Sequence, residues 1–324
     1  MIAVVGIASE TPVRLLMEAC ASKKIPCTLF NQRRQGDWSV QYDVFRPNAS
    51  ILANGDVTFT PSECSGLYLR TMDHTKLPEW AGTTTDRCRI EDTYSNLWML
   101  LDDETLGTRV VNSPSVQLSN NSKPYQSIII HEHGLDIPDT CITSDEDVAQ
   151  DFLTKHAAVI YKSISGTRSI VKRADGKSLA NLSRIRYCPV QFQECVMGFN
   201  VRVHVIGEQA IATRIRSDAV DYRYATQEGK STALEPYDLS PDVAAKCVRL
   251  AHALRLPFAG IDLMMADDGR TICFEVNPSP GYSYYEQHTG QRISHALADL
   301  LAEEIPYGSK PVDAGRKLTS RRCG

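Results

Sequence analysis

The stretch of this chain that most constrains its fold spans residues 260–281, with the sequence GIDLMMADDGRTICFEVNPSPG. Two short apolar segments, 261–265 and 271–276, flank the sequence Asp-Asp-Gly. A glycine-containing turn between two β-prone segments predicts a β-hairpin. We expect a two-residue turn at Asp268 and Gly269, and this turn determines how the two strands pair.

The predicted pairing puts two carboxylates side by side. Counting back from the turn sets Asp262 opposite Glu275, and the alternation of side chains along a strand places Asn277 on the same face. The other face is expected to be apolar, with Ile261, Leu263, Phe274 and Val276. Like charges placed opposite one another destabilise a sheet, so the polar face is either an ordinary solvated surface or a cation site. Hard oxygen ligands without His or Cys suit Mg²⁺ or Mn²⁺.

Composition narrows the class of protein. With 324 residues, 42% of them hydrophobic and 23% charged, the chain is long enough for two or three globular domains. The net charge of -4 argues against a general nucleic-acid binder. No apolar run reaches the roughly 18 residues of a membrane span, and the first residues lack the pattern of a signal peptide. We therefore expect a cytoplasmic protein with no membrane contact, whose ten cysteines, none in a C-x-x-C pair, are free thiols.

The beginning of the chain predicts a parallel α/β unit. An apolar segment at 2–5, a helix start at Thr11 and Pro12, and a second strand at 27–30 form a β-α-β pattern. Gly6 stands alone rather than in a G-x-G-x-x-G sequence, which argues against a dinucleotide site. A strand at 67–70 and a helix at 86–104 follow, and Asn-Ser-Pro at 112–114 marks the first domain boundary.

Two lysines are candidates for contacts with an anion. Ser122, Lys123 and Pro124 begin a helix that Gly134 ends, so Lys123 adds its charge to the positive end of that helix. Lys162 ends a strand and is followed by a small, hydroxyl-rich loop that offers several backbone N–H groups to a phosphate. The alternatives are a solvated lysine in the first case and a plain hairpin loop in the second. The loop that follows Lys162 does not have the Walker A sequence.

A strand at 189–196, interrupted by Glu194, precedes a second hairpin at 198–215. This hairpin turns at Gly207-Glu208 and carries Arg202 and His204 on one face. A two-residue turn places the returning Arg214 and Arg216 on the face opposite Arg202, whereas a three-residue turn places all three together. The sequence leaves both registers open.

The order of these parts, more than any one of them, resembles the ATP-grasp ligases. Within that superfamily the chain is similar to the RimK-type and glutathione-synthetase-like group, with a likeness to the enzymes that cross-link ribosomal precursor peptides. The resemblance covers about residues 121–301. The motifs that carry it are Lys123, Lys162 with its small-residue loop, Gln193-Glu194, Gly-x-x-x-Arg at 198–202, Gly-Ile-Asp at 260–262 and Glu-x-Asn-Pro at 275–278. Asn200 departs from the Asp that related sequences often have there, while Arg202 is kept.

The resemblance implies an α/β chain with the α+β ATP-grasp fold. A small parallel α/β domain (1–112) would precede a central subdomain (113–190) and a C-terminal subdomain (191–308), with ATP between these two. The basic tail, 309–324, is expected to be disordered.

The resemblance also implies a role for each candidate site residue. Asp262, Glu275 and Asn277 would bind Mg²⁺, with Mn²⁺ as an alternative. Arg202 and Arg216 would lie near the transferred phosphoryl group, and the hinge at 193–196 would grip adenine, largely through its backbone. Lys123 and Lys162 are expected to contact the phosphates of ATP, and the loop from Ser163 to Ser169, with Ser165 and Gly166, is expected to close over them. The hinge residues expected to contact the nucleotide are Gln193, Glu194, Cys195 and Val196.

The implied reaction is that of a carboxylate-amine or carboxylate-hydroxyl ligase that forms an acyl phosphate from ATP. Such chemistry requires positioning and neutralisation of charge rather than a nucleophile on the protein. We expect a carboxylate-bearing substrate, a peptide or protein whose side chains are joined, and the resemblance allows a homodimer. The alternatives are a ligase of amino acids or a dipeptide, and a catalytically silent nucleotide-binding scaffold.

Two further regions are expected to select the acceptor. They are the polar and aromatic loop at 217–231 and the group of Tyr282, Tyr284 and Tyr285, because both border the hairpin at 260–281 that carries the predicted metal ligands. His204 is expected to be a packing residue of its strand rather than a substrate contact.

Overall fold

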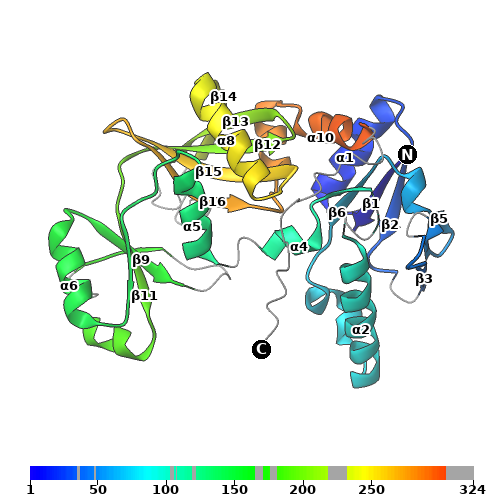
Figure 1. Cartoon of the computed structure of the whole chain (residues 1–324), viewed down its shortest axis with the longest axis horizontal. Helices are drawn as coiled ribbons and strands as arrows, with labels where there is room; N and C mark the ends of the chain where they lie inside the picture. Colours follow the sequence, from blue (N-terminus) through cyan, green and yellow to red (C-terminus); the bar gives the residue numbers. More distant parts are fainter. Residues whose placement is uncertain are drawn as a thin grey trace, which may run out of the picture.

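The computed structural model describes residues 1–34, 37–46, 49–102, 106, 108–118, 122–164, 171–175, 181–217 and 232–303. Figure 1 shows three lobes in a row, with the beginning of the chain at one end, a five-stranded sheet in the middle and a four-stranded sheet at the other end.

The first lobe is built on the predicted parallel sheet. Its strand order is β2-β1-β6-β7, and all three pairings are parallel. These strands span Cys27–Asn31 (β2), Ile2–Gly6 (β1), Gly66–Arg70 (β6) and Arg109–Val111 (β7). Helix α1 (Thr11–Ser22) makes the predicted crossover between β1 and β2, with Pro12 in its first turn. The N-terminal β-α-β prediction is therefore confirmed.

A small antiparallel sheet and a long helix complete this lobe. The sheet has the order β3-β4-β5, and both of its pairings are antiparallel. Its strands span Trp38–Gln41 (β3), Ile51–Asn54 (β4) and Val57–Phe59 (β5). Helix α2 (Thr84–Leu100) begins at a capping box between Thr83 and Asp86. Short 3-10 turns occur at Pro61–Glu63 (η3), His74–Lys76 (η4) and Pro78–Ala81 (η5).

The second lobe along the chain lies at the end of the row away from the N-terminus (Figure 1), and we call it the central lobe because it corresponds to the predicted central subdomain. Its sheet, the central sheet, is antiparallel and has the order β10-β9-β11-β8. Its strands span Lys172–Arg173 (β10), Val159–Ser163 (β9), Val190–Glu194 (β11) and Thr140–Thr143 (β8). Helix α6 (Glu146–Lys155) and η7 (Leu182–Tyr187) cover one face around Phe152, Phe192 and their neighbours. The cap of α6 is Asp145, whose side chain accepts from the N–H groups of Asp147 and Val148.

The third lobe carries the two predicted hairpins side by side. Its sheet has the order β14-β13-β12-β15-β16, and its strands span Thr232–Tyr237, Gln209–Ser217, Gly198–Ile206, Phe258–Ala266 and Thr271–Asn277. Ser240 caps helix α8 (Pro241–Ala253). This helix and α5 (Lys123–Glu132) pack on one face of the sheet, and Val203, Ile261 and Leu263 from that face are fully buried there.

The opposite face of the five-stranded sheet packs against the first lobe. Phe258, Ile206 and Ile215 join a core that includes α1 and the last helix, α10 (Ile293–Ala302). Helix α9 (Ser283–Thr289) adds Tyr285 to this core, and the four-residue helix α4 (Pro114–Gln117) connects the lobes. Helix α5 falls in the segment expected to form the central subdomain, and α10 in the segment expected to form the C-terminal one. Each therefore packs across a predicted domain limit.

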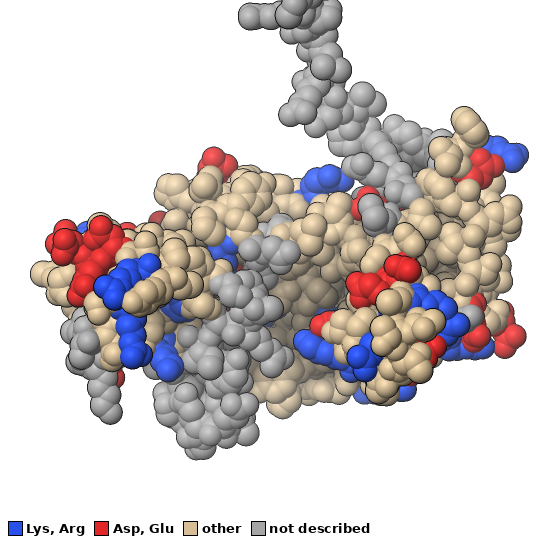
Figure 2. Space-filling view, turned by 90° about the horizontal axis from the view of Figure 1, so that it is seen from below, with Lys and Arg blue, Asp and Glu red and all other residues tan. Residues whose placement is uncertain are grey.

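Two general expectations can be compared with the described residues. The nine cysteines among them are free thiols, as predicted. No described helix has the length and apolar character needed to cross a membrane. Figure 2 shows one face of the molecule, on which Lys, Arg, Asp and Glu gather at the two ends, whereas the middle, where it is not covered by grey atoms, is mostly uncharged and hollowed.

Candidate functional site

The hairpin of β15 and β16 places Asp262 directly opposite Glu275, as predicted, but by a different route. The Ala266 N–H donates to Arg270 O, so the loop holds three residues rather than the expected two. A β-bulge between Asp262 and Leu263 restores the register by one residue. The predicted pair therefore exists because two deviations from the simple hairpin compensate each other.

The bulge also changes which side chains fill the apolar face. Phe274 was expected there but is only half-buried, whereas Cys273, one residue earlier, is 1% exposed and pairs with Leu263. Burial, reinforced by the neighbouring Cys247 and the carboxylates of Asp262 and Glu275, raises the pKa of Cys273 well above its ordinary value. This thiol is therefore a neutral packing group beneath the carboxylates.

Each of the two carboxylates has a cation bonded to it. Arg202 lies across from Asp262 on β12, and its Nη1 is 2.6 Å from Asp262 Oδ1. Lys123, in the first turn of α5, places Nζ 3.0 Å from Glu275 Oε2. The two cations reduce the repulsion that neighbouring carboxylates would otherwise experience. The structure thus brings together four predicted site residues that are up to 152 residues apart.

Asn277 ends β16 on the face of the carboxylates, opposite Gly260. Its Oδ1 accepts from the Ser279 N–H at 2.9 Å, which orients the amide oxygen. Within the described ranges, no three His, Cys, Asp or Glu side chains gather into a metal cluster. The available donors are therefore two carboxylates and one amide oxygen, an incomplete hard-oxygen set. This set fits Mg²⁺, which usually takes one or two carboxylates and completes its shell with water and substrate phosphates.

The turn after Asn277 is held by side chains from the first lobe. The Asn112 amide donates to Pro278 O and to Phe258 O, and its oxygen accepts from the Phe258 N–H. Arg70, at the end of β6, donates to Ser279 O and Ser279 Oγ at 2.9 Å each. Sequence reasoning missed both residues. The sequence around Asn112 indicates only a domain boundary, and nothing local to Arg70 indicates a partner 209 residues away.

The central sheet carries Lys162 and Gln193 on one face. Lys162 pairs with Gln191 across β9 and β11, and its Nζ lies 3.4 Å from Gln193 Oε1. The opposite face of these strands, with Tyr161 and Phe192, forms the core under α6. Ser163 ends β9 and is exposed. Ser165 and Gly166, with the rest of the predicted phosphate loop up to Ser169, lie outside the described residues.

Glu194 stabilises the predicted hinge at 193–196 through its side chain. Its Oε1 accepts from the Asp139 N–H at 2.9 Å and from Arg270 Nη1 at 2.8 Å. The bond from Arg270 lowers the pKa of the Glu194 carboxyl. The N–H groups of Glu194 and Cys195 donate to Asp139 O and Ala158 O, at 2.9 Å each. These hinge donors are therefore engaged in holding the connection between the central and C-terminal lobes.

The register of the second hairpin separates Arg216 from Arg202. Ile206 pairs with Gln209, so the turn has two residues, and Gly207 takes a positive φ of 55° that suits such a turn. Alternation then sends Arg216 to the face opposite Arg202, where Glu235 binds it at 2.8 Å. The grouping of Arg202 with Arg216 that the resemblance implied therefore does not occur on one face of the sheet.

The aromatic residues beside the hairpin play different parts from those expected. Tyr282 is fully buried, and its hydroxyl donates to Pro12 O at 2.5 Å, so it is a core residue rather than an acceptor contact. Tyr285 is 7% exposed and packs against His204, while Tyr284 is 43% exposed. His204 is fully buried, as predicted for a packing histidine, and burial lowers its pKa well below the ordinary value. The loop at 218–231 lies outside the described residues.

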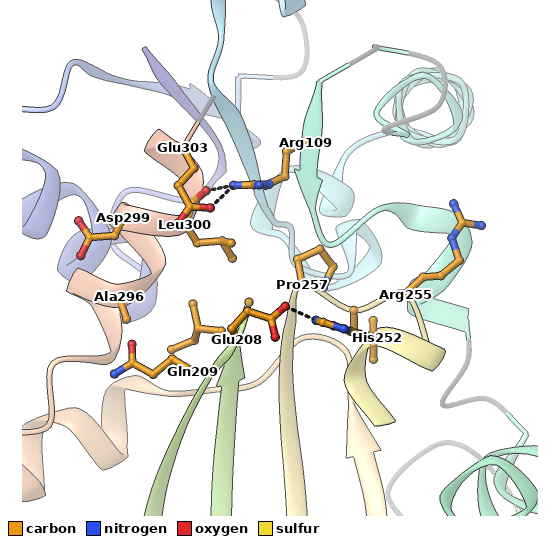
Figure 3. A pocket seen from close by; sticks show the side chains of 13 residues that line it. Arg109, Glu208, Gln209, His252, Arg255, Pro257, Ala296, Asp299, Leu300 and Glu303 are labelled. Carbon is orange, nitrogen blue, oxygen red and sulfur yellow. Dashed lines mark hydrogen bonds and ion pairs between the residues drawn. The ribbon is translucent and has the colours of Figure 1, made fainter. Parts of the chain in front are cut away.

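Two cavities lie apart from these residues. One, of about 600 Å³, is bounded by the turn of β12 and β13, the end of α8, and α10, with ion pairs of Glu208 with His252 and of Arg109 with Glu303. Figure 3 shows these two pairs on opposite sides of the pocket. The other, of about 740 Å³, opens on the core face of the central sheet. Neither is lined by a residue of the predicted site.

Comparison with known proteins gives consistent matches. The RimK-like ATP-grasp domain matches residues 120–301. A probable alpha-L-glutamate ligase of Xylella fastidiosa is 28% identical over 216 residues, which is 61% of this chain and 70% of the relative.

Solved structures match over almost the whole chain. The ATP-grasp ligase PsnB, complexed with a minimal precursor, Mg and ADP, has a TM-score of 0.76 and 24% identity, covering 93% of this chain and 96% of its own. A RiPP-associated ATP-grasp ligase of Chryseobacterium gregarium, in complex with ADP and a leader and core peptide, has a TM-score of 0.77 and 20% identity, covering 94% and 97%. These likenesses include the first lobe.

Proposed function

The chain belongs to the RimK-like ATP-grasp family and is an ATP-grasp ligase, an enzyme that uses ATP and Mg²⁺, and from this premise we propose that it modifies a peptide or protein. In the proposed reaction, a side-chain carboxylate is activated with ATP and joined to an amine or a hydroxyl. The observation that carries the proposal is the pair of carboxylates on one face of β15 and β16, with Lys123 and Arg202 bonded to them.

Three residues are proposed to hold the metal. Asp262, Glu275 and Asn277 supply oxygen donors on one face of the hairpin, and Mn²⁺ could replace Mg²⁺ because it accepts the same ligands. When bound, the ion neutralises charge on the phosphates of ATP. The protein contributes the rigid sheet that keeps the three donors in place.

The nucleotide is proposed to lie between the central and C-terminal sheets. Lys123 and Lys162 would contact its phosphates, Ser163 would begin the loop that closes over them through Ser165 and Gly166, and Gln193 would orient Lys162. The hinge 193–196 would grip adenine. Because the N–H groups of Glu194 and Cys195 serve the hinge itself, the adenine contact falls to the Val196 N–H and to hinge carbonyls.

The chemistry divides into two displacements. A carboxylate oxygen of the substrate attacks the γ-phosphorus of ATP, the bond to ADP breaks, and an acyl phosphate forms. An amine or hydroxyl then attacks the acyl carbon, loses its proton, and releases phosphate. Arg202, 5% exposed and fixed by Asp262, is proposed to stabilise the charge on the transferred group. Arg216 lies on the opposite face of the sheet, so its proposed role is limited to the start of the loop at 217–231, which is expected to select the acceptor.

The nature of the substrate rests on the extent of the structural match. The solved ligases that cover 93–94% of this chain were captured with a precursor or with leader and core peptides. Their likeness supports a peptide substrate because it includes the first lobe, which extends beyond the ATP-grasp domain. The alternative is ligation of glutamate or another small molecule, which the name of the Xylella relative supports. A cytoplasmic location, a homodimer and the limits of the domains remain predictions.

The experiment pairs a mass measurement with ADP release. We expect the enzyme, with ATP and Mg²⁺, to release ADP only when a carboxylate-bearing peptide is present, and the peptide to lose one water mass per bond formed. Asp262→Asn and Glu275→Gln should abolish ADP release while the protein stays folded. ADP release with free amino acids alone would favour the small-molecule alternative. Unchanged release in both variants would contradict the proposed site.

A further inference from the structure

Strand β16, which carries Glu275 and Asn277, is the last strand of its sheet. Among the described residues its outer main-chain groups therefore face no neighbouring strand, and buried N–H and C=O groups need partners from elsewhere. Near the turn, Asp136 supplies them. Its N–H donates to Thr271 O at 3.1 Å, and its carbonyl accepts from the Cys273 N–H at 2.8 Å.

Between the two proposed ligands, a single side chain takes the place of a neighbouring strand. The amide of Gln126 donates from Nε2 to Val276 O at 2.8 Å, and its Oε1 accepts from the Val276 N–H at 2.9 Å. Gln126 is 2% exposed and the Val276 side chain is fully buried. Both bonds are therefore shielded from water, which strengthens them and makes their loss costly.

Gln126 also connects two parts of the proposed site. It lies one helical turn after Lys123 on α5, and Lys123 bonds Glu275, the residue before Val276. Helix α5 thus holds the same short segment twice, once through an ion pair on a side chain and once through the main chain. No local sequence pattern indicates this role, because a glutamine in a helix is ordinarily a solvated residue.

We infer that Gln126 is a positioning residue for the metal site. It holds the main chain at Val276 so that Glu275 and Asn277 present their oxygens together, and it sets the distance between these ligands and Lys123. The inference rests on the proposed function, in which Glu275 and Asn277 hold the ion. Groups that orient metal ligands typically affect metal affinity by about 10–100-fold when removed.

The test is Mn²⁺ binding in the presence of ADP, measured by electron paramagnetic resonance without any peptide substrate. We expect Gln126→Met, which keeps the volume and removes both bonds, to raise the Kd for Mn²⁺ about 10–100-fold. In turnover, the apparent KM for Mg²⁺ should rise by a similar factor, while kcat at saturating Mg²⁺ changes far less.

The chain offers a matched control in Gln32. This side chain is fully buried, and its amide holds Met72 in the same two-way manner, at 2.5 Å and 2.8 Å, inside the first lobe. Gln32→Met removes the same bonds from a different place. It should lower the unfolding midpoint as Gln126→Met does, but should leave the Kd for Mn²⁺ within about twofold.

The outcomes separate the inference from the function on which it rests. If the unaltered protein binds no Mn²⁺ with ADP, the proposed metal site fails. If it binds Mn²⁺ and a folded Gln126→Met binds equally well, or if Gln32→Met weakens binding as much, the positioning role is wrong. Should Gln126→Met not fold, Gln126→Asn, whose shorter side chain cannot span the same gap, is expected to show the same rise in Kd.

Discussion

The ion pair of Arg202 with Asp262 allows the structural and chemical contributions of the site to be separated. The two side chains are 6% and 18% exposed, and their closest N–O distance is 2.6 Å. Removing one member of a buried pair leaves the other without its charge partner, which costs about 3–5 kcal/mol. Because Asp262 keeps some exposure to water, we expect Arg202→Met to lower the free energy of unfolding by about 3 kcal/mol.

Asp262→Asn should cost less. Its amide oxygen still accepts from the guanidinium, so we expect a loss of about 1–2 kcal/mol. In the double variant neither charge remains, and no carboxylate is left opposite Glu275 at this position. We therefore expect the double variant to lose about 2 kcal/mol, well below the sum of the single losses, with a coupling of about 2–3 kcal/mol.

The assay is urea unfolding of the four proteins in the presence of a chelator, with ADP release measured in parallel. Stability should be partly restored in the double variant, whereas ADP release should be lost in both single variants and in the double one. Losses that add within about 0.5 kcal/mol would refute the ion pair. Recovery of ADP release in the double variant would show that neither group acts on the substrate.

Two further changes test the packing around the site. Burial, helped by Arg202, lowers the pKa of His204 below its ordinary value of 6.5, so the unfolded chain binds more protons and stability is lost as the pH falls below about 6.5. The free energy of unfolding, measured between about pH 7.5 and about pH 5.5, should fall by up to about 1.4 kcal/mol per pH unit. His204→Phe should flatten this dependence on pH. An equal slope in the two proteins would contradict the assignment of the pH dependence to His204. A Cβ on Gly260 would lie 2.1 Å from Arg202 Nη2 and 2.7 Å from Pro280 Cβ, so Gly260→Ala should cost about 1–3 kcal/mol and reduce ADP release by at least about tenfold. Gly281→Ala, where a Cβ meets nothing within 4 Å, is the control and should change neither stability nor ADP release.

The pattern of the sequence indicated the local parts of the site. Alternation in β15 and β16 predicted that Asp262, Glu275 and Asn277 share one face, and the flanking Ser and Pro predicted the helix start at Lys123. These features depend on periodicities of two and 3.6 residues and on the chemistry of turns, which neighbouring residues determine. The order of motifs along the chain then identified the ATP-grasp family without any knowledge of distances.

Only the tertiary structure showed which distant residues meet. The bulge that restores the pairing of Asp262 with Glu275 depends on packing beneath the sheet, where Cys273 rather than Phe274 fills the space. The two-residue turn of the second hairpin separated Arg216 from Arg202, a choice that the sequence left open.

The contacts around strand β16 show the same limit. Gln126 bonds the strand, and Asn112 and Arg70 bond the turn that follows it, from 150, 166 and 209 residues away. A side chain that bonds a distant main chain needs no particular sequence pattern around it, because the main chain offers the same N–H and C=O at every non-proline residue. The sequence alone therefore determined which groups carry the proposed chemistry, and the packing of three lobes determined what holds them in place.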